Sequence, residues 1–229
     1  MTARDTGLCT WNGHRSYNRY MPVYKRLILR LIPLSLIAGL QLIYLPLNRT
    51  LSGGIAPALL VDGRISVQPD WVFIYLAALP LWILALIWST IKMDDRMYRV
   101  SVITAFFAIL VGVMTYWLYP TYVIRPDITS QGLGSDWLRW VYANDRPYNA
   151  LPSSHVYLTV LIGLLWSQWK PKWRWLLLGL VLVICLSTLF TKQHYLLDVV
   201  CGAFLAGLAY NIGIGIDRWW ENQKSGRKK

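Results

Sequence analysis

The sequence is poor in charged residues and in cysteine, and each shortage narrows what the chain can be. Only 15% of the 229 residues are Asp, Glu, Lys or Arg, whereas a soluble domain carries about a quarter. This shortage disfavours a water-soluble domain. The three cysteines are too few for a disulfide framework and show no metal-binding spacing. The three histidines form no metal-binding cluster either, so we expect neither a metal nor another cofactor.

Apolar and aromatic residues dominate instead. Hydrophobic residues make up 55% of the chain. The 13 Trp and 14 Tyr are many for this length, and several flank apolar runs, as anchors at a membrane interface do. This composition predicts an integral membrane protein of one domain, residues 1–229. Residues 1–24 are polar, basic and aromatic, so we do not expect a cleaved signal peptide.

Six apolar runs are long enough, or nearly so, to cross a bilayer as a helix, which takes about 20 residues. The sequence therefore predicts an all-α fold, a bundle of six transmembrane helices. The predicted spans are about 27–47, 71–91, 100–124, 153–169, 173–190 and 195–216.

Lys and Arg residues alternate along the predicted topology. They gather in the arm 1–26, in the loops after the second and fourth spans, and in the tail 217–229. By the positive-inside rule these segments are cytoplasmic, and an even number of spans puts both termini on that side. The net charge of +12 is then a topology signal, so we expect no nucleic-acid partner. On the opposite side, the apolar patch 55–60 is a candidate for a short interfacial helix.

The unusual polar residues are predicted to meet at the extracytoplasmic edge of the bundle. Arg125 ends the third span and His155 opens the fourth. Two passes of about 18 residues, roughly 27 Å each, then return the chain to the same depth at His194. Lys192 and Asp198 come with it. Ionisable residues at membrane depth are costly, which makes this group a candidate functional site.

These residue types suit a phosphate. The cations Arg125 and Lys192, together with the hydroxyls of Ser153 and Ser154 at a helix start, could bind an anion. Two histidines support phosphoryl transfer without a metal, because one can attack phosphorus while the other protonates the leaving oxygen. If residues from His194 onward are helical, Asp198 lies one turn later and can orient that imidazole. Taken singly, the two serines are more typical of helix caps.

The combined pattern resembles the type-2 phosphatidic acid phosphatase superfamily, whose motifs are Lys-x6-Arg-Pro, Pro-Ser-Gly-His and Ser-Arg-x5-His-x3-Asp. The resemblance covers about residues 119–202, the expected catalytic core. It implies that His194 is the nucleophile that becomes phosphohistidine, with Asp198 as its partner and His155 as the general acid. It also implies that Arg125 and Ser153 bind phosphate. Arg146 of Arg146-Pro147 is a rival for the first motif, but it lies too close to Pro152 for the usual spacing.

Three positions depart from the family motifs. Leu118 stands in place of the first-motif lysine, Ser154 in place of glycine and Thr188 in place of arginine. Lys192 is the candidate replacement for the missing cations. The variant pattern looks more like the branch that includes the inositol phosphorylceramide synthases, which transfer a phosphorylated head group between lipids.

The sequence thus predicts a metal-independent lipid phosphate phosphatase in a multi-pass, bacterial-type inner or plasma membrane. Its active site would be extracytoplasmic, its intermediate a phosphohistidine, and its partners a lipid phosphate and membrane lipids. The alternative is a phosphotransferase that moves a phosphorylated head group to a lipid or alcohol acceptor. A channel or transporter would spread polar residues through the spans, whereas here they gather at one edge.

Overall fold

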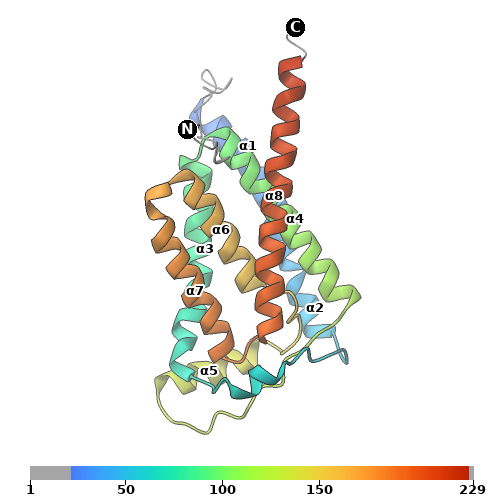
Figure 1. Cartoon of the computed structure of the whole chain (residues 1–229), viewed down its shortest axis with the longest axis vertical. Coiled ribbons are helices and arrows are strands. Elements are labelled where there is room, and N and C mark those ends of the chain that lie inside the picture. The colour runs from blue at the N-terminus through green and yellow to red at the C-terminus, as the bar shows by residue number, and fades with distance from the viewer. Residues whose placement is uncertain (1–21, 227–229) are drawn as a thin grey trace, which may run out of the picture.

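The structure is a computed structural model that describes residues 22–226. Within this range it is a bundle of helices (Figure 1) without strands, and its only β-type pairings are two isolated bridges. The all-α prediction is confirmed. The α-helices are α1 (Val23–Leu42), α2 (Tyr44–Thr50), α3 (Val72–Lys92), α4 (Asp95–Leu118), α5 (Leu133–Asn144), α6 (Ser154–Trp169), α7 (Arg174–Phe190) and α8 (Leu196–Gly226).

Five helical stretches in the described range are long and apolar enough to cross a membrane, judged by length and composition. They are Val23–Thr50, Pro69–Lys92, Asp95–Leu118, Pro171–Phe190 and Leu196–Gly226. The remaining predicted span, the fourth (about 153–169), corresponds to α6, which has only 16 residues. A multi-pass membrane fold is compatible with these helices, while the number six and the orientation of the termini stay predictions.

The third predicted span was wrong at both ends. Helix α4 begins at Asp95, because the Asp94 side chain accepts hydrogen bonds from the backbone N–H groups of Arg96 and Met97. It ends at Leu118, just before Pro120, since the residue preceding a proline is disfavoured in helical conformation. Arg125 therefore lies in an extended segment beyond the helix rather than at its end.

The two long loops also differ from expectation. The patch 55–60 is not a helix: Ile55 forms an isolated bridge with Thr121, and Pro57 lacks the N–H that a helix interior needs. A short 3₁₀ helix, η1 (Leu60–Arg64), follows instead. The unexpected α5 lies in the second loop, where its apolar side packs Leu138 and Val141 against the start of α3.

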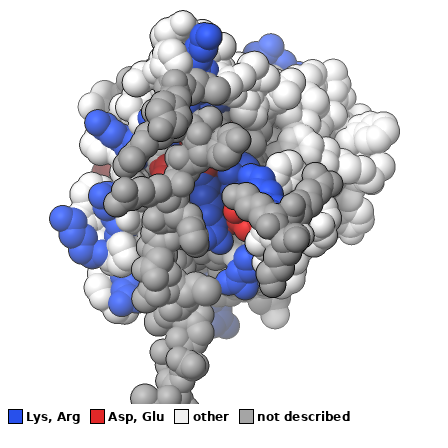
Figure 2. Space-filling view, turned by 90° about the horizontal axis from the view of Figure 1, so that it is seen from above, with Lys and Arg blue, Asp and Glu red and all other residues white. Residues whose placement is uncertain are grey.

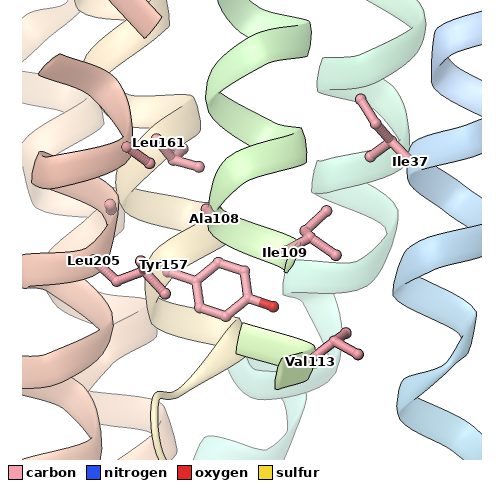
Figure 3. Close-up of a cluster of buried hydrophobic side chains, with 9 residues drawn as sticks. Ile37, Ala108, Ile109, Val113, Tyr157, Leu161 and Leu205 are labelled. Atoms are coloured by element: carbon pink, nitrogen blue, oxygen red, sulfur yellow. The ribbon is translucent and has the colours of Figure 1, made fainter. Parts of the chain in front are cut away.

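Close contacts among α4, α6 and α8 hold the centre of the bundle together. Tyr157 of α6 is fully buried among apolar side chains of α4 and α8 (Figure 3). A Cβ on Gly112 of α4 would lie 3.1 Å from the Tyr157 ring. A Cβ on Gly202 of α8 would lie 2.8 Å from the Ser153 carbonyl oxygen. Both glycines thus permit the close approach of α4 and α8 to α6.

The end of the bundle where α8 ends, opposite to the end where α6 and α8 begin, is rich in ion pairs. Figure 2 looks onto this end and shows Lys and Arg side chains spread over it. The buried Asp217 carboxylate accepts from Arg96 at 2.6 Å and from Arg99 at 2.7 Å. The buried Arg30 side chain pairs with Asp95 at 2.7 Å. These pairs join α8 and α1 to the start of α4, so the charges at this end serve the packing of the helices.

Candidate functional site

A narrow polar pocket lies at the end of the bundle where α6 and α8 begin. It encloses only about 10 Å³, room for roughly one water molecule, so a larger ligand must displace contacts within it. The residues lining it are Tyr44, Tyr75, Arg125, Asp145, Tyr148, Asn149, Ser154, His155, Gln193 and His194. Segments far apart in the sequence therefore meet here, and four of the seven predicted site residues are among them.

His194 lies in the connection between α7 and α8, two residues before α8 begins. The sixth span was expected to begin at about Tyr195, close to the observed start of α8 at Leu196. His194 precedes the helix, and the backbone N–H groups of Gln193 and His194 both donate to the Thr188 carbonyl. Asp198 lies in the first turn of α8 and is fully buried. Its Oδ2 accepts from the Tyr195 N–H at 2.8 Å and lies 3.5 Å from Nδ1 of His194. The carboxylate is thus beside the imidazole, at a distance longer than a hydrogen bond.

His155 faces the same pocket from the first turn of α6. Its ring stacks on Tyr75 of α3 with centroids 4.1 Å apart, and the Trp82 ring lies 4.9 Å away. The centroids of the His155 and His194 rings are 6.3 Å apart. Reacting atoms in a productive complex approach to about 3–3.5 Å. Both histidine rings therefore face the same small space, and a phosphorus centre between them would have to widen it.

Arg125 provides the positive charge of the pocket. Its side chain is only 10% exposed, and it donates to the Asp145 carbonyl and to Oε1 of Gln193. The guanidinium also lies 4.8 Å from the centroid of the Tyr142 ring. These contacts hold the guanidinium in place at the wall of the pocket. The rival Arg146 does not line the pocket, since its guanidinium donates to the Arg49 carbonyl.

Asp145 places a carboxylate next to this cation. Its Oδ1 accepts from the Tyr44 hydroxyl at 3.0 Å, and its Oδ2 lies 3.8 Å from the Arg125 guanidinium. Burial raises the pKa of the Asp145 carboxyl, and the Arg125 charge opposes that rise. The pocket therefore holds one fixed cation together with one acidic side chain.

The two serines have different positions. Ser153 is fully buried, and its Oγ accepts from the Val156 N–H at 3.4 Å, which caps α6. Its backbone N–H donates to the Asp198 carbonyl at 3.1 Å, so it joins the starts of α6 and α8. Ser154, which occupies the glycine position of the family motif, is the serine that lines the pocket.

Lys192 is not among the residues that line the pocket. Its ammonium donates to the Asp62 carbonyl at 2.8 Å, in the loop that precedes α3. Desolvation lowers the pKa of Lys192, and the Asp62 charge opposes that shift. The structure therefore does not bring Lys192 into the position of a replacement cation.

Sequence patterns did not single out several of the lining residues. Tyr44 and Tyr75 lie in predicted spans, where interfacial tyrosines are common. Asn149 carries a signal only in the structure: it has a positive φ of 60° and donates to the Tyr44 carbonyl at 3.1 Å. For Gln193 and Asp145 the only signal was proximity to the motifs.

An all-helical bundle of apolar helices with two histidines and an arginine around one polar pocket defines a membrane-type protein equipped to bind an anion. A family model described as the PAP2 superfamily matches residues 62–212, more than half of the chain. The chain belongs to this superfamily, which confirms the resemblance seen in its motifs and supports an activity of the phosphatase or phosphotransferase type. No curated protein and no solved structure gives a significant match.

Proposed function

We propose that the protein transfers a phosphoryl group from a lipid phosphate through a phosphohistidine at His194, without a metal. The placement of His155 and His194 on either side of one pocket carries this proposal. Arg125 faces the same space and neutralises charge on the phosphate oxygens. Asp198, beside Nδ1 of His194, leaves Nε2 as the attacking atom.

The reaction has two steps. In the first, Nε2 of His194 attacks phosphorus, the P–O bond to the leaving group breaks, and His155 donates a proton to the departing oxygen. In the second, His155 removes a proton from the acceptor, whose oxygen attacks phosphorus as the N–P bond breaks. Water as acceptor makes the protein a phosphatase, and an alcohol makes it a phosphotransferase. Asp198 stabilises the positive imidazole ring that forms in between.

An apolar cavity beside the pocket supports a lipid as substrate. It encloses about 190 Å³ and is lined mainly by apolar side chains of α3, α6 and α7. Trp82 forms part of its wall and also contacts His155. The Trp82 indole N–H donates to the Thr159 hydroxyl at 3.0 Å, and that hydroxyl donates to the His155 carbonyl at 2.6 Å. A hydrocarbon chain in this cavity would therefore lie one side chain away from the general acid, with the Trp82 ring between them.

The predicted orientation places the pocket at the extracytoplasmic face. Helix α8 runs along the bundle (Figure 1): it begins beside the pocket, and near its other end Asp217 pairs with the basic residues Arg96 and Arg99. Basic segments favour the cytoplasm. The proposed reaction would thus occur on lipids of the outer leaflet.

Turnover in detergent tests the proposal. Purified protein is supplied with a lipid phosphate in the presence of a chelator, and free phosphate, new phospholipid and acid-labile protein phosphorylation are measured together. We expect His194→Ala to abolish all three. His14→Ala is the matched control, because His14 lies in the basic arm 1–26, outside the family motifs. Undiminished turnover by His194→Ala would overturn the mechanism.

A further inference from the structure

The charge of the pocket is low for a phosphate site. Among its described lining residues, Arg125 is the one Lys or Arg and Asp145 the one Asp or Glu. Leu118 and Thr188 occupy the positions where the family motifs have cations. Leu118 is exposed at the end of α4, and the buried Thr188 donates to the Cys185 carbonyl. Neither position supplies a compensating charge.

Lys192 does not add positive charge to the pocket. Its ammonium is held by the Asp62 carbonyl, and the Asp62 carboxylate accepts from the Leu196 N–H at 2.9 Å at the start of α8. Moving Lys192 into the pocket would release one of the contacts that join the loop before α3 to α8. Among Lys and Arg side chains, the positive charge available to a ligand is therefore that of Arg125, to which the proposed mechanism adds the proton that His155 carries as general acid.

Asp145 has an oxygen directed at the same guanidinium. Its Oδ1 is taken by the Tyr44 hydroxyl, whereas Oδ2 is 3.8 Å from Arg125 and the side chain is 29% exposed. A phosphate that pairs with Arg125 must approach this carboxylate. The negative charges of the Asp145 carboxylate and the phosphate repel each other, and this repulsion grows with the negative charge of the phosphate. A phosphomonoester carries about −1.5 to −2 at neutral pH, while a phosphodiester carries a single charge.

We propose that Asp145 selects the charge of the substrate, so that the pocket accepts a monoanionic phosphodiester in preference to a dianionic phosphomonoester. This inference rests on the proposed function. With a diester, attack by His194 breaks the P–O bond to one alcohol, which receives the proton of His155. The phosphohistidine keeps the second ester group. An acceptor alcohol or water then gives its proton to His155, forms the new O–P bond and releases Nε2. Asp145 acts as a specificity residue and takes no part in proton transfer.

The test compares two lipids with the same acyl chains, one a phosphomonoester and one its methyl diester, at about pH 8, above the second phosphate pKa of about 6. We expect wild-type kcat/KM to be higher for the diester. Asp145→Asn should raise kcat/KM for the monoester by about tenfold, mainly through a lower KM, and change the diester value less than about threefold. Asp145→Glu should restore the wild-type preference. Asp127→Asn is the matched control, because Asp127 is exposed in the same loop and does not line the pocket.

Equal effects of Asp145→Asn on both lipids would overturn the inference, since a residue that only holds Arg125 in place would affect both alike. A measurement on the unchanged protein guards against misfolding of the variant. Dimethyl phosphate, a monoanion, should stabilise the wild-type protein against thermal unfolding at lower concentration than methyl phosphate, a dianion. The reverse order contradicts charge selection. Absence of turnover with either lipid contradicts the proposed function instead, and the order of the two methyl phosphates still decides the role of Asp145.

Discussion

Replacing Asp198 by asparagine isolates the electrostatic part of the proposed mechanism. The substitution keeps the size of the side chain and an oxygen that can accept from the Tyr195 N–H, but it removes the negative charge 3.5 Å from Nδ1 of His194. Both side chains are buried, at 0% and 7% exposure. With an effective dielectric constant of about 20, a unit charge pair at this distance is worth about 5 kcal/mol. Each 1.36 kcal/mol changes a rate tenfold, so phosphorylation of His194 should slow by about three to four orders of magnitude.

The assay is the single-turnover rate at which acid-labile phosphate appears on the protein. Asp217→Asn is a matched control, because Asp217 is also buried, pairs with Arg96 and Arg99 at the other end of the bundle and does not line the pocket. Its thermal stability should fall while the phosphorylation rate changes little. If Asp198→Asn phosphorylates within tenfold of wild type while folding normally, the charge of Asp198 does not stabilise the imidazole and the assigned role is wrong.

Three further predictions probe the lipid cavity, the helix contact and the acidic side chain. Ala85→Phe should fill the cavity and raise KM for long-chain lipids but not for a short soluble phosphate ester, whereas Ala77→Phe, exposed on the same helix, should change neither. Gly202→Ala should lower the free energy of unfolding by about 1–3 kcal/mol through overpacking, while Gly207→Ala, with open space around it, should not; equal melting temperatures would contradict this. Because the folded-state pKa of Asp145 is raised, the stability linked to it is full below the ordinary pKa of 3.8 and is lost as pH rises through the raised value. Asp145→Asn should therefore melt higher than wild type at neutral pH, and this gain should vanish below pH 3.8.

The apolar helices could be predicted from the sequence because their signal is local. Runs of apolar residues specify α3, α4, α7 and α8 whatever their neighbours do. Helix α5 has no such run, and it forms where Leu138 and Val141 find an apolar surface on α3. It is an amphipathic helix of 12 residues, which gives a weaker sequence signal than a membrane span. The patch 55–60 is apolar but contains Pro57, and the candidate interfacial helix does not form over residues 55–59.

The candidate site, too, could be predicted only in part from the sequence. His155, His194 and Arg125 could be predicted to share one edge because the length of a membrane pass returns the chain to the same depth. The partners of Arg125 could not, since Asp145 and Gln193 reach it from two different connections. Nor could the tyrosine that holds Asp145, because Tyr44 is contributed by the end of the first span. The sequence therefore indicates the histidines and the arginine of the site, whereas the acidic side chain beside Arg125 is brought there by long-range contacts.

Lys192 is the clearest instance of this division, because its depth was predictable and its partner was not. Beside His194 in sequence, it was expected to replace a missing cation. It instead adopts a positive φ of 50° and donates to the Asp62 carbonyl, while the Asp62 carboxylate accepts from the Leu196 N–H. The residues on both sides of His194 are thereby joined to the same aspartate. Lys192→Ala should accordingly disturb the position of His194 and slow the turnover of monoesters and diesters alike. If Lys192 instead bound the substrate phosphate, the substitution would mainly weaken the binding of the monoester.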